Sequence, residues 1–234
     1  MLSVLVAFCP SLLLMLLFYS ADRYEPEPRA HIAAAVGLGA LAMAVATALV
    51  PLLAGLIGDD YLTLGGLPAR VVEAFVVEGL AEEALKFAML AGVVYRWQEF
   101  DEPLDGVIYG VAVALGFGTV ENVRYVLGGG VEVGLLRGVF AVPEHALLGA
   151  TMGAFLGKAK LAGGSRGRRL SLGAAALLVP ALLHGAYDLV LLELVGPAMY
   201  VAVGLGSAAL WAWVLWRVRR ARDASPFRPR RPPG

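Results

Sequence analysis

The sequence predicts an all-α, polytopic membrane protein with about seven transmembrane helices around a polar intramembrane cavity. The first observation is composition: 59% of the 234 residues are hydrophobic and the mean hydropathy is +0.74, whereas soluble domains are ~45–50% apolar. The second is the recurrence of apolar stretches near the ~20 residues that a membrane-spanning helix needs. The third is the small set of ionisable side chains that these stretches nevertheless contain.

Seven apolar segments follow one another with short connections, at residues 2–20, 30–57, 68–95, 104–127, 135–158, 171–193 and 197–217. We interpret the first as a retained helix, not a signal peptide, because it has no basic start and no small-residue cleavage pattern. The short connections predict a single helical transmembrane domain over residues 1–220. The basic residues 221–234 are expected to form a disordered cytoplasmic tail.

Basic residues indicate the orientation of the predicted helices, since they concentrate on the cytoplasmic side. They cluster after the fifth and seventh segments, at Lys158, Lys160, Arg166, Arg168, Arg169, Arg217, Arg219, Arg220 and Arg222. Seven spans then place the N-terminus outside and the C-terminus in the cytoplasm. The formal net charge is zero, so no basic field exists for nucleic acid. Cys9 is the single cysteine, which excludes a disulfide framework.

Small residues recur at every fourth position in the fourth and fifth segments. They are Gly106, Gly110, Ala114 and Gly118, followed by Gly149, Gly153 and Gly157. Such rows let helix backbones approach closely in lipid. We therefore expect them to draw the polar helices of the chain together.

Ionisable and amide side chains occur in four of the apolar segments. They are Glu82, Glu83 and Lys86 in the third, Glu121 and Asn122 in the fourth, His145 in the fifth, and His184 and Asp188 in the sixth. A charge at the bilayer centre costs ~2.5–3.5 kcal/mol on insertion scales, and such side chains usually face a cavity. The helical rise of about 1.5 Å per residue places them between mid-membrane and the outer half. Their similar depth predicts that they converge.

Carboxylates and imidazoles in one cavity allow two schemes for activating water. In the first, a glutamate removes a proton from water that attacks an amide carbonyl, and a histidine or asparagine donates to the oxyanion. In the second, Glu121, His145, His184 and Asp188 bind zinc or another divalent ion, which activates the water. The spacing does not decide between them. The sequence has no HExxH or GxSxG motif.

Four short motifs occur in order within the predicted spans. They are Glu82-Glu83-x-x-Lys86, Phe117-x-x-x-Glu121-Asn122, His145 with Gly153 eight residues later, and His184-x-x-x-Asp188. Together they resemble the motifs of the PrsW family, over about residues 70–190. That family consists of multi-spanning bacterial membrane proteases and belongs to a superfamily with the CAAX prenyl endopeptidases and the bacteriocin-processing, abortive-infection-type proteins.

The resemblance implies an intramembrane endopeptidase of the bacterial plasma membrane, with a single-pass anti-sigma factor among its possible membrane protein substrates. It implies that Glu82 activates water and that His184 binds this water or the oxyanion. We expect Glu83 and Lys86 to control the protonation of Glu82, and Asn122 to donate hydrogen bonds. Whether a metal assists stays open at this point. The alternatives are a proton or cation transporter that uses the same acids, and a scaffold that binds transmembrane helices.

Overall fold

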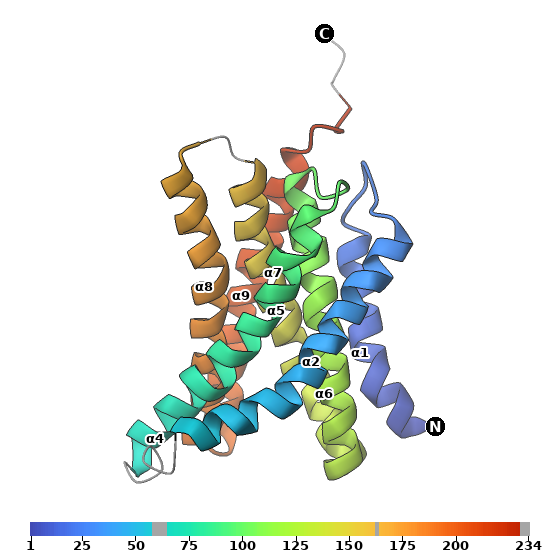
Figure 1. Ribbon diagram of the computed structural model, residues 1–234. Coiled ribbons are helices and arrows are strands. Elements are labelled where there is room, and N and C mark those ends of the chain that lie inside the picture. The colour runs from blue at the N-terminus through green and yellow to red at the C-terminus, as the bar shows by residue number, and fades with distance from the viewer. Residues whose placement is uncertain (58–64, 162–163, 230–234) are drawn as a thin grey trace.

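The computed structural model describes residues 1–57, 65–161 and 164–229, and these residues form helices and turns without a strand. The helices pack into one bundle (Figure 1). Within the described residues, the stretches long and apolar enough to cross a membrane are Leu2–Tyr19, Arg29–Gly55, Pro103–Leu161, Arg166–Glu193 and Pro197–Asp223. The all-α membrane architecture is therefore confirmed. The number of seven crossings stays a prediction, because five stretches meet these criteria.

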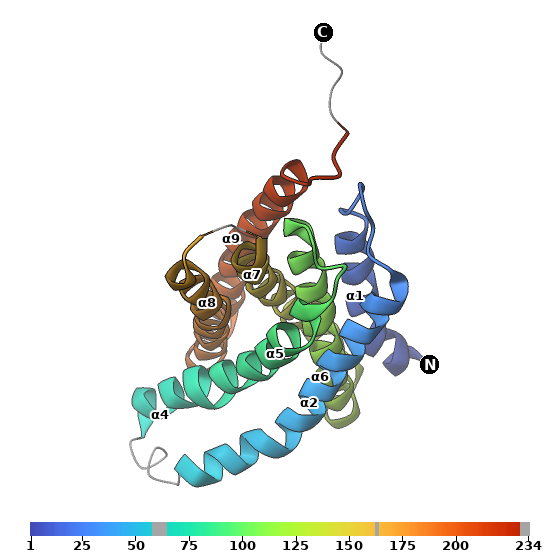
Figure 2. The same ribbon diagram turned by 45° about the horizontal axis from the view of Figure 1, so that its top comes forward.

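Two central helices supply most of the buried core. They are α6 (Pro103–Val139) and α7 (Ala141–Leu161). Around them lie α1 (Leu2–Tyr19), α2 (Arg29–Ile57), α8 (Arg166–Glu193) and α9 (Pro197–Asp223) (Figures 1 and 2). The surrounding helices expose large aliphatic side chains, among them Leu13 and Leu205. A surface of this kind suits lipid, because lipid tails are as apolar as leucine.

The chain reverses within α6, at Gly130. This glycine has φ 83°, a left-handed conformation that glycine adopts without the steric cost of a Cβ. After the reversal the helical residues 131–139 run along α1, because a Cβ on Gly134 would meet Val6 and one on Gly138 would meet Pro10. The reversal lies between the predicted fourth and fifth segments and carries the chain into α7.

The predicted third segment folds as a continuous rod of three pieces. These are α4 (Gly66–Val72), the π-helix η1 (Glu73–Leu80) and α5 (Ala81–Gly92), followed by a short 3₁₀ turn, η2 (Val94–Arg96). π-Helical turns are rare and occur frequently at functional sites. In this rod the π-helix ends directly before Glu82 and Glu83. It packs closely on α8, because a Cβ on Gly79 would lie 3.0 Å from the carbonyl oxygen of Ala181.

The two glycine rows face each other between α6 and α7, as the sequence predicts. A Cβ on Gly106 would overlap the carbonyl oxygen of Gly153, and one on Gly110 would overlap that of Gly149. The two helices are therefore antiparallel and in backbone contact along this seam. The seam brings Gly118 against the ring of His145, which fixes the position of His145 beside α6.

The glycine seam leads to a test of stability. We expect Gly110→Ala to destabilise the protein by about 1–3 kcal/mol, because the new methyl group meets backbone atoms that cannot rotate away. The matched control is Gly204→Ala in α9, where a Cβ has no neighbour within 4 Å. Thermal unfolding in detergent measures both. Equal melting temperatures for the two variants would contradict the close contact of α6 and α7.

The two ends of the bundle differ in charge. The basic α7–α8 connection and the end of α9 lie at the same end (Figure 1), as the proposed orientation requires. Residues 221–223 belong to α9, although the sequence suggested disorder from residue 221. Ser225 is also buried, because its hydroxyl donates a hydrogen bond to Glu102 before α6. Residues 230–234 of the predicted tail lie outside the described residues.

Candidate active site

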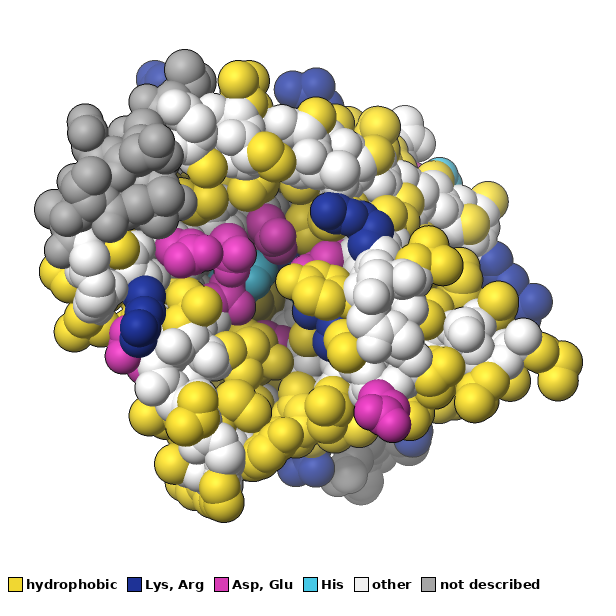
Figure 3. Space-filling view, turned by 90° about the horizontal axis from the view of Figure 1, so that it is seen from below, with side chains coloured by type: hydrophobic (Ala, Val, Ile, Leu, Met, Phe, Trp, Pro, Cys, Tyr) yellow, Lys and Arg dark blue, Asp and Glu magenta, His cyan; other side chains and the backbone are white. Residues whose placement is uncertain are grey.

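A cavity of about 760 Å³ opens at the end of the bundle opposite to the C-terminus. Figure 3 looks into this end and shows acidic side chains and a histidine in a hollow with an apolar rim. The ionisable residues of its wall include Glu78, Glu82, Glu121, Glu144, His145, His184 and Asp188. Four predicted helical segments thus contribute to one polar cavity.

Behind the cavity wall, Lys86 and Glu83 form a buried ion pair. Glu83 is 0% and Lys86 1% exposed, and Lys86 Nζ donates to Glu83 Oε1 over 2.7 Å. Lys86 Nζ also lies 3.1 Å from Nδ1 of His145 and 4.1 Å from the ring centroid of Phe117. These contacts satisfy the ammonium group inside the protein, so Lys86 and Glu83 support the wall of the cavity and do not line it.

The contacts of His145 determine its tautomer. An ammonium group has no acceptor, so Nδ1 of His145 must accept from Lys86 and the proton must sit on Nε2. Nε2 then donates to Oε2 of Glu121 over 2.7 Å. The same carboxylate oxygen accepts from Nη2 of Arg137 at 2.6 Å. A chain of hydrogen bonds therefore connects Lys86 to Glu121 and Arg137 through one neutral imidazole.

His184 lies between two carboxylates. Its Nδ1 is 3.0 Å from Oε1 of Glu83, and its Nε2 is 3.3 Å from Oδ2 of Asp188. The ring also meets that of His145 edge to face, with a centroid distance of 5.6 Å. The i, i+4 pair of α8 thus has the local geometry that its spacing predicts. Oε1 of Glu83 contacts His184 directly and also accepts from Lys86, which in turn donates to His145. Both histidines are therefore connected to α5.

Glu82 differs from its neighbour Glu83, because it lines the cavity. Its side chain is 14% exposed and lies 3.6 Å from Lys86 Nζ, measured to Oε2. This Oε2 accepts no hydrogen bond from the described residues. Oε2 is itself buried and faces Lys86, so the partly exposed Glu82 side chain has a cation behind it and the cavity in front of it, which is the arrangement that a general base for water needs.

Asn122 is not brought to the cavity. It is 0% exposed, and its Nδ2 donates to the backbone carbonyls of Val6 and Ala7 in α1, over 3.3 and 3.2 Å. The donors that the sequence suggested for Asn122 are therefore used to hold α1 against α6. Because Asn122 directly follows Glu121 in the sequence, the two side chains lie on different faces of the helix.

Sequence reasoning missed Arg137 as a member of the site. Arg137 lies within the predicted fifth apolar segment, and a charged side chain inside such a segment was the signal that could have found it. The hydrogen bond between Arg137 and Glu121 depends on the reversal of the chain at Gly130, which brings residue 137 back beside residue 121. Glu144 and Tyr187 also line the cavity. Glu144 lies beside His145 in the predicted fifth segment, whereas no pattern in the sequence singled out Tyr187.

The suggested metal ligands do not form a closed set. Among the described residues, only Asp22, Glu102 and Asp105 place one donor atom each within 4.8 Å of one another, and they lie outside this cavity. The ring of His145 is hydrogen-bonded to Lys86 and Glu121, whereas that of His184 is hydrogen-bonded to Glu83 through Nδ1. Oδ2 of Asp188 lies 3.3 Å from His184 Nε2 but accepts no hydrogen bond from the described residues. No three of Glu121, His145, His184 and Asp188 bring donor atoms within 4.8 Å of one another in the part of the chain that the structure describes, and their assignment as metal ligands stays a prediction.

A multi-helix membrane protein with carboxylates and imidazoles around an open polar cavity has the make-up of an intramembrane hydrolase. Residues 27–217 match the model of the family described as PrsW family intramembrane metalloprotease. The chain belongs to this PrsW family, and it is a membrane-embedded protease. No solved structure matches the chain.

Several proteins named Protease PrsW are similar over most of their length. The one from Geobacillus kaustophilus is 37% identical over 213 residues, which cover 91% of this chain and 89% of that protein. The one from Bacillus subtilis is 34% identical, and the match covers 92% of this chain and 94% of that protein. The one from Clostridioides difficile is 35% identical, and the match covers 80% of this chain and 78% of that protein. The family resemblance that the sequence motifs suggested is therefore confirmed.

Proposed function

We propose that the protein is an endopeptidase that cleaves membrane-associated proteins with water activated by Glu82. The observation that carries this proposal is the partly exposed Glu82 side chain, which lines the cavity with Lys86 Nζ 3.6 Å behind it. A water molecule in the cavity can donate a hydrogen bond to the Glu82 carboxylate and reach a substrate carbonyl on its other side. The remaining ionisable groups stabilise the charged form of Glu82 and hold its side chain in position.

The reaction begins when Glu82 accepts a proton from water and the water oxygen attacks the carbonyl carbon of the scissile peptide bond. The carbonyl electrons move to the oxygen, which becomes an oxyanion. His184 is the donor best placed to stabilise it, because its ring lies on the cavity wall beside Glu83. The oxyanion electrons then re-form the carbonyl group, the C–N bond breaks with its electron pair moving to nitrogen, and Glu82 returns its proton to this leaving amine. Each proton and electron pair is then accounted for without a metal ion.

Glu83, Lys86, His145 and Glu121 act as positioning residues in this scheme. Lys86 lies behind Glu82 and stabilises its charged form. His145 connects Lys86 to Glu121 through its two ring nitrogens, and Glu121 is held in turn by Arg137. Asp188 keeps the His184 ring oriented from the other side. Asn122 contributes indirectly, by fixing the helix that carries Glu121 to α1.

The proposed substrate is a single-pass membrane protein, and an anti-sigma factor is the candidate that the family resemblance suggests. The cavity opens at the end opposite to the basic loop and tail. Since basic residues favour the cytoplasmic side, the cavity would open toward the extracytoplasmic side. The protein would sit in the bacterial plasma membrane with its N-terminus outside, and cleavage would occur in the outer half of the bilayer.

A reconstitution experiment tests this function. The full chain is incorporated into liposomes with single-pass anti-sigma factors that carry a different tag at each end. We expect fragments whose new termini, located by mass spectrometry, lie in or just beyond the extracytoplasmic half of the substrate helix. Liposomes without the chain are the control. Intact substrates together with a proton or cation flux would contradict proteolysis and support the transporter that the same acids allow.

A further inference from the structure

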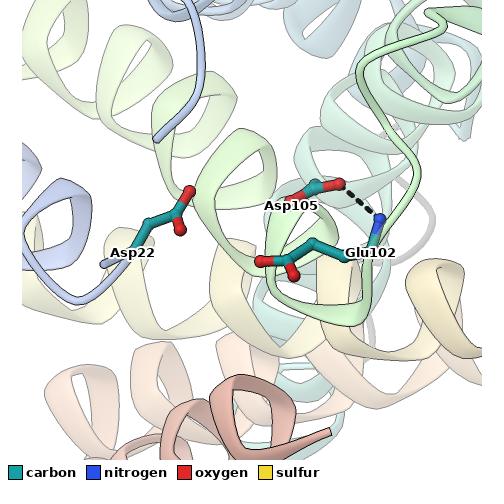
Figure 4. Close-up of side chains that lie close together, drawn as sticks. All are labelled: Asp22, Glu102 and Asp105. Carbon is teal, nitrogen blue, oxygen red and sulfur yellow. Dashed lines mark hydrogen bonds between the residues drawn. The ribbon is translucent and has the colours of Figure 1, made fainter. Parts of the chain in front are cut away.

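Three buried carboxylates meet at the end of the bundle opposite to the active-site cavity. Asp22 lies in the α1–α2 connection, Glu102 caps the start of α6, and Asp105 lies in its first turn. Their side chains point toward one another (Figure 4), and one oxygen from each lies within 4.8 Å of the others. The three residues are 4%, 1% and 1% exposed. We call this group the acidic triad.

Within the described residues, no basic side chain lies at ion-pair distance from the carboxylates of the acidic triad. Neither oxygen of Asp22 accepts a hydrogen bond within the described chain, and Oε1 of Glu102 accepts none either. Burial raises the pKa of the Asp22 and Glu102 carboxyls above their usual range. Three buried carboxylates that face each other are costly in their charged form, and a bound cation would offset this cost.

The other atoms of the acidic triad are already ordered. Oδ2 of Asp105 accepts from the backbone N–H groups of Asp101 and Glu102, over 2.8 and 2.6 Å. Glu102 accepts from the hydroxyl of Ser225. Local hydrogen bonds therefore hold Asp105 and Glu102 in place, and the unpartnered Asp22 carboxylate points at them from a different segment. This is a preorganised set of oxygen donors.

We propose that the acidic triad binds a hard divalent cation, such as Mg²⁺ or Mn²⁺. Carboxylate oxygens are the ligands that such ions prefer, and imidazole or thiolate ligands, which zinc would favour, are absent from the triad. Bound water would complete the coordination of the ion, as is usual for Mg²⁺. The cation would connect the α1–α2 loop to the start of α6, and through Ser225 to the segment after α9.

This site is separate from the active site. Glu121 follows Glu102 by nineteen residues along α6, which corresponds to roughly 28 Å at the helical rise per residue. A metal ion found in the purified protein would therefore not by itself indicate a catalytic metal. The proposal does not depend on the reaction mechanism, since neither Asp22 nor Asp105 lines the active-site cavity.

Manganese binding to the full-length protein tests the proposal. The detergent-solubilised chain is stripped with EDTA and titrated with Mn²⁺, and free Mn²⁺ is measured by electron paramagnetic resonance, with Mg²⁺ as competitor. We expect saturable binding that Asp22→Asn and Glu102→Gln each weaken by about tenfold or more. The matched control is Glu25→Gln, which removes the same charge from an exposed position in the same loop and should change the affinity by no more than about twofold.

Thermal unfolding of the same proteins gives a second measurement that does not depend on binding. Mn²⁺ should raise the melting temperature of the wild type but not that of Asp22→Asn. Without metal, Asp22→Asn should melt no lower than the wild type, because it removes one of three repelling carboxylates. Absence of saturable Mn²⁺ binding in the wild type would overturn the proposal. So would binding that Asp22→Asn and Glu102→Gln retain but His184→Ala loses, because the ion would then lie in the active-site cavity.

Discussion

Replacing Glu82 by glutamine should reduce peptide-bond cleavage by about a thousandfold, within the 10²–10⁴ range that a general base contributes. Glutamine has nearly the same shape as glutamate but cannot accept a proton from water at neutral pH. The site around it should stay in place, because Glu82 makes no hydrogen bond through Oε2 and its contact with Lys86 Nζ is 3.6 Å long. The loss should therefore appear in kcat, with little change in folding.

The measurement is the rate of cleavage of a doubly tagged single-pass substrate in liposomes, with thermal unfolding as a check of folding. The matched control is Glu73→Gln, because Glu73 lies on the same helical rod but does not line the cavity. It should cleave at a rate close to that of the wild type. If Glu82→Gln were as active as Glu73→Gln, Glu82 could not be the base, and its position at the cavity wall would need another explanation.

The sequence was sufficient to predict which helices share the polar cavity. Charged and amide side chains are so costly in lipid that Glu82, Glu121, His145 and His184 had to meet in a protein-lined space. Helical spacing also predicted the pair of His184 with Asp188 and the facing glycine rows of α6 and α7. These conclusions depend only on hydropathy and on a regular helical period, both of which a single sequence contains.

Several features depended on three-dimensional detail that the helical period does not contain. Adjacent residues diverge in direction, so that Glu82 faces the cavity while Glu83 is buried, and Glu121 faces His145 while Asn122 faces α1. The π-helix before Glu82 changes the angle between successive side chains. The acidic triad comes from loops and from a helix start, where no periodic pattern exists to reveal that Asp22 and Glu102 are neighbours in space.

Replacing Lys86 by methionine should destabilise the protein by about 3–5 kcal/mol, because it leaves a buried carboxylate without its cation. Glu83 is 0% exposed and would keep only His184 as a partner. Nδ1 of His145 would lose the hydrogen bond from Lys86, and this contact would no longer fix the proton of the ring on Nε2. Unfolding in a denaturing detergent measures the effect. The matched control is Lys158→Met, which removes an exposed lysine of α7 and should cost no more than about 0.5 kcal/mol.

The double variant Glu83→Gln with Lys86→Met separates stability from catalysis. It removes both charges of the buried pair, so it should regain about 0.5–3 kcal/mol relative to the sum of the single variants. It should nevertheless remain inactive, because Glu82 would still lack the cation that stabilises its charged form. Full recovery of cleavage in the double variant would show that Lys86 serves only the fold. A wild-type unfolding midpoint for Lys86→Met alone would show that Glu83 is neutral without it, and the buried ion pair would then not support the active site.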